Sequence, residues 1–461
     1  MSDSSPAVAG PAAPKLAAVT PALGTGLAIV LALLGGLLVD AVAPRGPVTT
    51  AQGLIVMAIA LLVGLAGGTL ARTRWVLVPQ LIAYAVAVEV GRSGLTVPSL
   101  AVRLDNVYGI IAFVITRGVD GILLLLPMTT GVLLGRGLGR RLVGTIRSSR
   151  RPPVGTILVG AITVALVALV VWPASTPPFV GPDGTPIPSS VAELARVRLG
   201  GADQSVMIRG ASTDKPVLLY LSGGPGQSDL PLARTLSAGW TDDFVFVDLD
   251  QRGNGKSYAA IDPLSDMTID QAVSDVIELT DYLRDRFDED KIYLMGESWG
   301  SILGVLAVQR RPDLYHAWIG SGQMVDVLDT DRRIYRDLLA YATEAGDEDL
   351  LASLAAVGEP PYRDIPWANS NLLAWYEYLY KPYTPSAGYI ARGDASGLDP
   401  FGVLGSEYTF LEKRDVLRGL IDTFTVLYPQ LYDLDFRESV PRLSVPVYIL
   451  DGKAELDGRR D

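Results

Sequence analysis

Residues 291–301, KIYLMGESWGS, decide the fold of the C-terminal part of this chain. Their first half is short and rich in β-branched and aromatic residues, which indicates a buried strand. Ser298 follows in the pattern GxSxG, and the small-residue run at 302–309, ILGVLAVQ, predicts a helix directly after it. A serine on such a tight strand-to-helix turn exposes its hydroxyl oxygen for attack. We therefore predict that Ser298 is a catalytic nucleophile.

Apolar runs alternate with amphipathic ones around this stretch. Further buried strands are predicted at residues 217–223, 244–250 and 445–450 (VLLYLSG, FVFVDLD and VPVYIL), and an amphipathic helix at residues 270–286. This alternation is typical of a mostly parallel sheet covered by helices, so the predicted fold class is α/β.

Two glycine-containing segments follow predicted strands. In SGGPG, at 222–226, the glycines allow backbone N–H groups to point at a developing oxyanion, and we expect the N–H groups of Gly224 and Trp299 to form that hole. In DQRGNGKS, at 250–257, we expect a structural turn held by the Asp250 carboxylate and the Arg252 guanidinium.

Together with the GESWGS segment, these motifs resemble the proline iminopeptidase family of α/β-hydrolases, which carry HGGPG, DQRGxGxS and GxSxGG-like segments in this order. The resemblance covers residues 190–461 and implies a helical cap, inserted at about 324–440. Ser222 stands where the family usually has histidine, and Ser301 where it often has glycine.

The resemblance places the catalytic acid at Glu455, with Asp457 as the alternative. The family's histidine would follow later, but the only histidine is His316, between the helix after Ser298 and the next strand, far from the predicted elbow. We expect the hydrolase domain to be C-terminally truncated, or to have lost its base, and the chain to have little hydrolytic activity by itself. Family members bind the substrate's α-amine with cap carboxylates, and nothing singles out one of Glu377, Glu407 and Glu412.

The N-terminal part contains charge-free apolar runs long enough to cross a bilayer. Three are clear, and two interrupted ones are further candidates, which gives about five transmembrane helices; the clear runs are 22–39, 53–70 and 154–172, and the candidates 75–91 and 107–135. Arg117 and Asp120, inside the last candidate, are expected to form a local ion pair.

The predicted organisation is an N-terminal tail (1–21), a transmembrane region (22–172), a Pro-rich linker (173–190) and the α/β-hydrolase domain (191–461). Arginines cluster after the second and fourth candidate spans, and the positive-inside rule places those loops in the cytoplasm. The chain is therefore predicted to be a multi-pass membrane protein with an extracytoplasmic hydrolase domain.

Composition excludes several functions. The net charge is −11, and the acidic residues concentrate after residue 173, which argues against nucleic acid as a partner. The chain has no cysteine and one histidine, so thiolate catalysis and cysteine or multi-histidine metal sites are excluded. We expect no cofactor and no metal.

The leading hypothesis is a membrane-anchored serine hydrolase that removes N-terminal residues, such as proline, from short peptides through an acyl-enzyme. An esterase of the same fold is the first alternative. The second is a non-catalytic membrane protein whose hydrolase-derived domain binds a ligand or partner, with Glu89, Arg117 and Asp120 serving transport or sensing. Membrane lipid is the other expected partner, and protein partners are unknown from the sequence.

Overall fold

The computed structural model describes residues 19–95, 97–104, 107–143, 153–379, 384, 387 and 404–452. The chain divides into two compact units. We call residues 1–96 and 117–172 the helical unit, and residues 97–116 and 173–461 the sheet unit. Residues 97–116 therefore belong with the C-terminal part of the chain, although in the sequence they are the connection after the third apolar helix and the first ten residues of the fourth.

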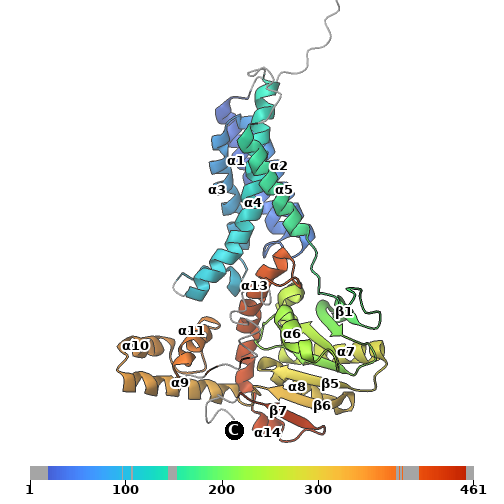
Figure 1. Cartoon of the computed structure of the whole chain (residues 1–461). Helices are drawn as coiled ribbons and strands as arrows, with labels where there is room; N and C mark the ends of the chain where they lie inside the picture. Colours follow the sequence, from blue (N-terminus) through green and yellow to red (C-terminus); the bar gives the residue numbers. More distant parts are fainter. Residues whose placement is uncertain are drawn as a thin grey trace, which may run out of the picture. The chain divides into compact units, whose positions relative to one another are not determined.

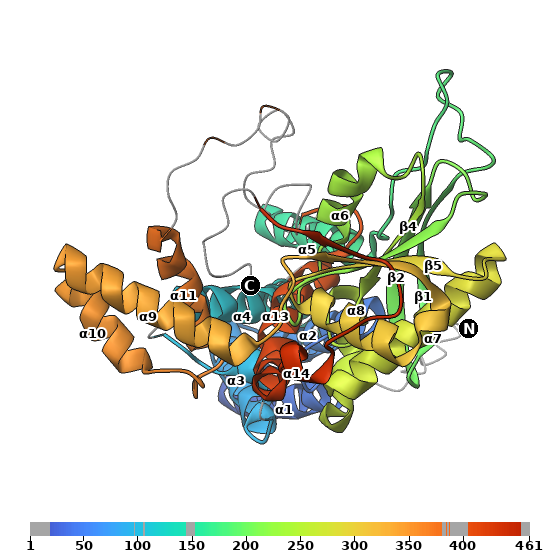
Figure 2. The same ribbon diagram turned by 90° about the horizontal axis from the view of Figure 1, so that it is seen from below.

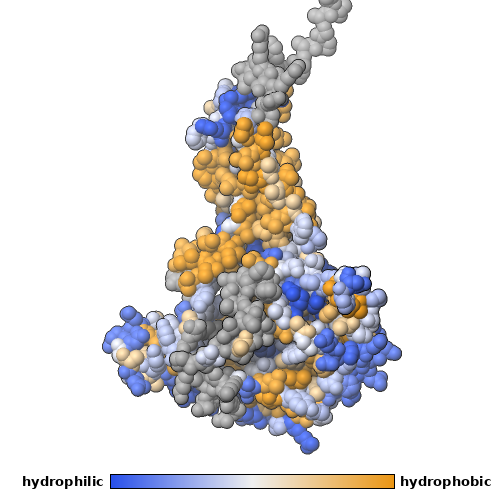
Figure 3. Space-filling view, viewed as in Figure 1, coloured by the Kyte–Doolittle hydropathy of each residue, from blue (hydrophilic) through white to orange (hydrophobic). Residues whose placement is uncertain are grey.

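Five helices long and apolar enough to cross a membrane occur in the described residues, in agreement with the sequence. They are α1 (Pro21–Val42), α2 (Thr50–Ala71), α3 (Leu77–Arg92), preceded by the 3-10 turn Arg74–Val76, α4 (Val107–Leu142) and α5 (Val154–Val171). Figure 3 shows hydrophobic side chains gathered over their outer surfaces. At about 1.5 Å per residue, the 36 residues of α4 exceed the thickness of a hydrocarbon core.

Glycines let α2 and α4 approach each other closely. A Cβ on Gly64 would lie 2.2 Å from the carbonyl oxygen of Met128, and one on Gly135 would lie 2.1 Å from the carbonyl oxygen of Leu65. Such contacts between backbones are typical of helices that associate in lipid. There the hydrophobic effect does not drive helices together, and small residues allow the close approach that gives van der Waals packing.

Charged side chains join α3 to α4. Arg117 Nη2 lies 2.9 Å from Glu89 Oε2, and Arg92 Nη2 lies 2.8 Å from Asp120 Oδ2. The sequence predicted a local pair between Arg117 and Asp120, and the structure adds partners from a second helix to both residues. The sequence could not show that α3 brings Glu89 and Arg92 to these two residues. The network ties two helices together, which weakens the transport or sensing interpretation of these charges.

A seven-stranded sheet forms the centre of the sheet unit, with strand order β1-β2-β4-β3-β5-β6-β7. The strands are β1 (Val191–Leu199), β2 (Ala202–Gly210), β3 (Val217–Leu221), β4 (Val245–Asp250), β5 (Ile292–Glu297), β6 (Tyr315–Ser321) and β7 (Val447–Leu450) (Figure 1). β1, β2 and β4 pair antiparallel, and β4, β3, β5, β6 and β7 pair parallel. The predicted α/β class with a mostly parallel sheet is confirmed.

Helices cover both faces of the sheet (Figure 2). α7 (Ile269–Phe287) and α8 (Trp299–Arg310) lie on one face, and α6 (Leu230–Leu236) lies on the other. The apolar side of α7, predicted from its spacing, is fully buried at Val273, Val276, Leu279 and Leu283.

The helical insertion expected between the last two strands is present. It includes α9 (Val327–Ala345), α10 (Glu348–Val357), α11 (Trp367–Tyr376), α13 (Phe410–Leu427) and α14 (Phe436–Ser439). α9, α10 and α11 form a group that extends away from the sheet, around a core that includes Tyr335 and Leu354 (Figure 2). α13 instead packs against the sheet side, because its Val416, together with Tyr408 just before the helix, shares a core with Phe246 and Met295.

Candidate active site

Ser298 occupies a strained turn between β5 and α8. Its φ of 51° and ψ of −116° place a non-glycine residue in a region that L-amino acids rarely adopt. A Cβ on Gly296 would lie 2.3 Å from the carbonyl oxygen of Gly300, and a Cβ on Gly300 would lie 2.1 Å from that of Leu221. Only glycine fits either position, which is the physical reason for the GxSxG pattern.

The segment 222–226 lies beside this turn. A Cβ on Gly223 would be 3.4 Å from the Ser298 Cβ. Gly224 has a φ of +118° and Gly226 a φ of +100°, conformations that favour glycine. The structure therefore brings the segment that carries Gly224 next to Ser298, and Trp299 follows Ser298 as the first residue of α8.

Trp299 also connects three of the sequence motifs. Its fully buried indole N–H donates to Gln251 Oε1 at 2.8 Å. Gln251 Nε2 in turn donates to the carbonyl oxygen of Ser222 at 3.1 Å. Sequence reasoning missed Gln251, although its place inside the DQRG motif was a signal. Its amide holds the segment with Gly224 against the elbow.

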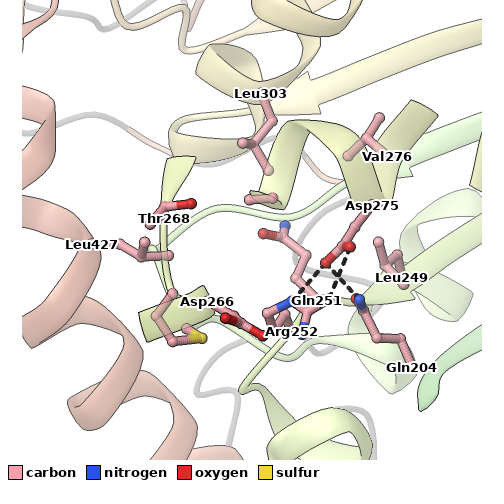
Figure 4. A pocket seen from close by; sticks show the side chains of 12 residues that line it. Gln204, Leu249, Gln251, Arg252, Asp266, Thr268, Asp275, Val276, Leu303 and Leu427 are labelled. Carbon is pink, nitrogen blue, oxygen red and sulfur yellow. Dashed lines mark hydrogen bonds and ion pairs between the residues drawn. The ribbon is translucent and has the colours of Figure 1, made fainter. Parts of the chain in front are cut away.

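The turn at 250–257 is held by Asp250, as predicted, but not by Arg252. Asp250 Oδ2 accepts from the Lys256 N–H at 2.8 Å. Arg252 Nε instead donates to Asp275 Oδ2 at 2.8 Å, and its Nη2 donates to the Gly200 carbonyl oxygen at 3.0 Å (Figure 4). The predicted part of Arg252 in the turn was therefore wrong, because its carboxylate partner comes from α7. The cavity beside this pair holds about 10 Å³, roughly the space of one water molecule.

Buried carboxyl groups lie near the elbow. Burial and the neighbouring Glu297 and Asp250 raise the pKa of Asp229 to about 7. Burial also raises the pKa of Asp250 to about 7, although the hydrogen bonds that Asp250 accepts act to lower it. Asp248 is completely buried, its two oxygens make no hydrogen bond of normal geometry with the described residues, and burial raises its pKa strongly. These groups therefore keep their protons to higher pH than exposed carboxyls do.

The carboxylate that precedes the nucleophile is held in place. Glu297 Oε2 accepts a hydrogen bond of 2.6 Å from the Tyr220 hydroxyl, and Tyr220 is opposite Asp248 in the parallel pairing of β3 with β4. The acidic groups thus form a continuous cluster, which extends from the buried sheet to Glu297 beside Ser298.

Ser298 Oγ has no basic partner in the part of the chain that the structure describes. It lies 3.7 Å from Met324 Sδ. His316 is exposed, packs its ring against that of Tyr293 with centroids 5.0 Å apart and planes tilted by 36°, and lies near the start of β6. Ser298 follows the opposite end of the neighbouring β5, about 16 Å away at 3.3 Å per residue.

Glu455 and Asp457 lie outside the described residues. The strand expected to precede them is present: β7 pairs with β6, and its Leu450 is opposite Ser321, whose carbonyl oxygen accepts from the Ser298 N–H at 3.0 Å. The segment after β7 therefore starts at the same edge of the sheet as the elbow.

Two of the cap carboxylates form ion pairs. Glu407 Oε1 lies 2.6 Å from Arg234 Nε, and Glu412 Oε2 lies 2.7 Å from Lys256 Nζ. The side chain of Glu377 is not among those that the structure describes. A cavity of about 650 Å³ lies farther along the cap, where its lining includes Arg103, Trp367 and Trp375. Among the described residues, no group of three or more acidic or histidine side chains is arranged to hold a metal ion.

Comparison with known proteins gives one family match and several relatives. The family model of serine aminopeptidase, S33, matches residues 232–345. "Probable aminopeptidase YbaC" of Bacillus subtilis (strain 168) is 31% identical over 274 residues, which are 59% of this chain and 83% of that protein.

Solved structures share less identity. A proline iminopeptidase-related protein from Thermus thermophilus is 19% identical, with a TM-score of 0.34 over 57% of this chain and 89% of that one. An epoxide hydrolase from Vigna radiata is 19% identical, with a TM-score of 0.31 over 57% of this chain and 80% of that one.

Proposed function

The chain belongs to the serine aminopeptidase S33 family, and on this basis we propose that it is a membrane-anchored serine hydrolase that removes N-terminal residues from short peptides. The observation that carries the proposal is Ser298 on its strained turn, beside the glycine-rich segment 222–226. Strain of this kind persists only where the surrounding structure enforces it, and it is typical of functional sites.

In the proposed reaction, Ser298 Oγ attacks the carbonyl carbon of the first peptide bond. A base takes the proton of the Ser298 hydroxyl and gives it to the departing amine as the C–N bond breaks and the acyl-enzyme forms, and water then hydrolyses the ester. The N–H groups of Gly224 and Trp299 stabilise the negative charge on the substrate oxygen. Glu455 is proposed to orient the imidazole of a histidine base. His316 cannot be that base from its position on β6.

The proposal predicts slow chemistry for the 461-residue chain, because no described base contacts Ser298 Oγ. An oxyanion hole and binding alone leave roughly 10³- to 10⁴-fold acceleration over water. Ser298 is partly exposed, so imidazole added to the solution can reach its hydroxyl and accept the proton. We therefore expect imidazole to raise the rate of acylation.

The experiment measures acylation of the full chain by an activated aminoacyl ester and by a fluorophosphonate probe, with and without imidazole, followed by mass spectrometry of the modified peptide. Ser298→Ala should abolish labelling. Ser265→Ala, at an exposed serine, is the matched control and should leave labelling unchanged. Equal labelling of wild type and Ser298→Ala would sink the proposal. Ester turnover without any cleavage of peptides would favour the esterase.

We also propose that the sheet unit lies outside the cytoplasm. Arg140 and Arg141 end α4, and Arg72 and Arg74 lie between α2 and α3, which fits cytoplasmic loops at both places. With five crossings, residues 97–106 and the chain after α5 then share the opposite side. Because the chain has no cysteine, single cysteines report topology without background. An impermeant maleimide on intact cells should label Ser265→Cys and spare Ser148→Cys, and the reverse pattern would exclude this orientation.

A further inference from the structure

A short segment of the chain completes a buried polar site on α13. The turn Pro98–Leu100 brings Ser99 to Asp422. Ser99 is 2% exposed and Asp422 is 1% exposed. The Ser99 N–H donates to Asp422 Oδ1 at 2.7 Å, and the Ser99 hydroxyl donates to Oδ2 at 2.7 Å. The Tyr258 hydroxyl donates to the same Oδ2 at 2.7 Å. Ser99 therefore supplies two of the three hydrogen bonds that stabilise this buried carboxylate.

The segment also covers apolar surface of the cap. Ala112 packs with Trp367 and Ile421 in one buried cluster. Arg103 lies over the Trp367 ring at 5.8 Å from its centroid, and its Nη1 donates to Asp364 Oδ1 at 3.2 Å. Trp367 and Ile421 are each 6% exposed, so Ala112 forms part of the core that surrounds them.

The helix that receives this segment also contacts both glycine-rich segments of the candidate site. A Cβ on Gly226 would lie 2.8 Å from the Gly419 carbonyl oxygen. The Thr423 hydroxyl donates to the Gly253 carbonyl oxygen at 3.3 Å. Asp422 adjoins Thr423 and lies about one turn from Gly419 on α13. The position of α13 therefore depends on contacts to Ser99 on one side and to the site segments on the other.

We propose that residues 97–116 are the built-in partner of an interaction surface on the cap, formed by Asp422, Ile421, Trp367 and Asp364, and that this segment holds α13 against the candidate active site. Its recognition chemistry is a charge-assisted double hydrogen bond to a buried carboxylate, flanked by an apolar cluster and an exposed ion pair. The occupant is a segment of this same chain. If the chain is cut after residue 172, this segment stays attached to the N-terminal fragment. The binding does not require catalytic activity.

The test uses the full chain with a specific protease site inserted between Trp172 and Pro173, both of which are exposed. After cleavage in mild detergent, an affinity tag on the N-terminus is used to recover the complex. We expect the fragment that begins at Pro173 to co-elute with the tagged fragment. Separation of the two fragments in the same detergent would overturn the proposal.

Substitutions then identify the contact. Ser99→Ala removes one donor, and Asp422→Asn places an amide donor opposite groups that are themselves donors. Each change should weaken retention about ten- to a hundredfold, which corresponds to the loss of a hydrogen bond to a charged group. Ser93→Ala is the matched control, because its exposed hydroxyl donates locally to the Val90 carbonyl oxygen. Equal retention in Ser99→Ala, Asp422→Asn and Ser93→Ala would refute the assignment.

A second measurement tests the geometry if Asp422→Asn fails to fold. Arg103→Cys combined with Asp364→Cys should react with a short bismaleimide to give one cross-linked species after linker cleavage. Arg103→Cys with Asp288→Cys is the control pair, because Asp288 follows α7, on the opposite side of the sheet unit from α11 (Figure 2). Cross-linking of the control pair at the same rate, or no cross-linking of Arg103→Cys with Asp364→Cys, would contradict the proposed contact.

Discussion

Replacement of Asp248 by asparagine should stabilise the protein, and increasingly so as the pH rises. The side chain is completely buried, its oxygens make no hydrogen bond of normal geometry with the described residues, and its pKa is raised by burial and by the nearby Asp229 and Asp250. Such a group binds its proton more tightly in the folded than in the unfolded chain. Its contribution to stability is therefore complete below pH 4 and is lost as the pH rises through the folded-state pKa.

The expected magnitude follows from the linkage between protonation and folding. Every unit between the unfolded pKa, about 4, and the working pH costs about 1.4 kcal/mol while the folded group stays protonated. At pH 7 the cost is at most about 4 kcal/mol, reached when the folded group is still fully protonated there, and asparagine does not incur it. A buried amide without partners costs about 1–3 kcal/mol, but the unpartnered carboxyl already carries a similar cost. We expect a net gain on the order of 2–4 kcal/mol at pH 7–8.

The assay is thermal unfolding of the detergent-solubilised chain at pH 5 and pH 8, followed by the fluorescence of the buried Trp299 and Trp318. At about 2 °C per kcal/mol for a unit of this size, the Tm of Asp248→Asn should exceed the wild-type Tm by about 5 °C at pH 8. The difference should be much smaller at pH 5. Asp242→Asn, at an exposed position, serves as control. A Tm difference that is the same at both pH values, or that shrinks as the pH rises, would refute the reasoning.

Three further substitutions test the packing arguments. Gly300→Ala should destabilise the sheet unit by about 3 kcal/mol or more, since its Cβ would lie 2.1 Å from the Leu221 carbonyl oxygen, and an unchanged Tm would contradict the close approach. Arg252→Ala should cost about 3–5 kcal/mol in urea unfolding because it leaves Asp275 buried without its ion pair, and Arg252→Ala with Asp275→Asn should recover part of that loss. Gly64→Val should disrupt the contact of α2 with α4, which is measured as aggregation or a lower Tm in detergent, whereas Gly26→Ala, with open space around it, should have no effect.

Features that depend on neighbouring residues could be predicted from the sequence. The elbow is an example, because a strand, two glycines and a helix of small residues, all close together in the chain, impose the geometry of Ser298. The five long apolar helices are another, because a span is recognised from its own composition. The amphipathic spacing of α7 likewise contains all the information needed to place its buried side.

Features that depend on residues far apart in the chain could not be predicted. Arg252 could pair with Asp250 or with Asp275, and only the path of α7 decides in favour of Asp275. The contact of Ser99 with Asp422 joins residues 323 positions apart, and no local pattern marks either of them. Residues 97–106 have the pattern of an ordinary connection between two apolar helices, and residues 107–116 have the pattern of the start of an apolar span, so nothing in either stretch assigns it to the sheet unit.

Serine at position 301, where the related family often has glycine, has a structural use in this chain. Its hydroxyl donates to the Ser298 carbonyl oxygen at 2.5 Å and accepts from the Met324 N–H at 2.9 Å. Gln323 Nε2 donates to the same hydroxyl oxygen at 3.2 Å. Glycine could make none of these bonds. Because residues 323 and 324 lead from β6 into the cap, Ser301 fixes the cap's first residues to the carbonyl group of the nucleophile. A cap that moves for substrate entry must therefore turn beyond residue 324, which leaves Ser298 and its neighbour Met324 in place.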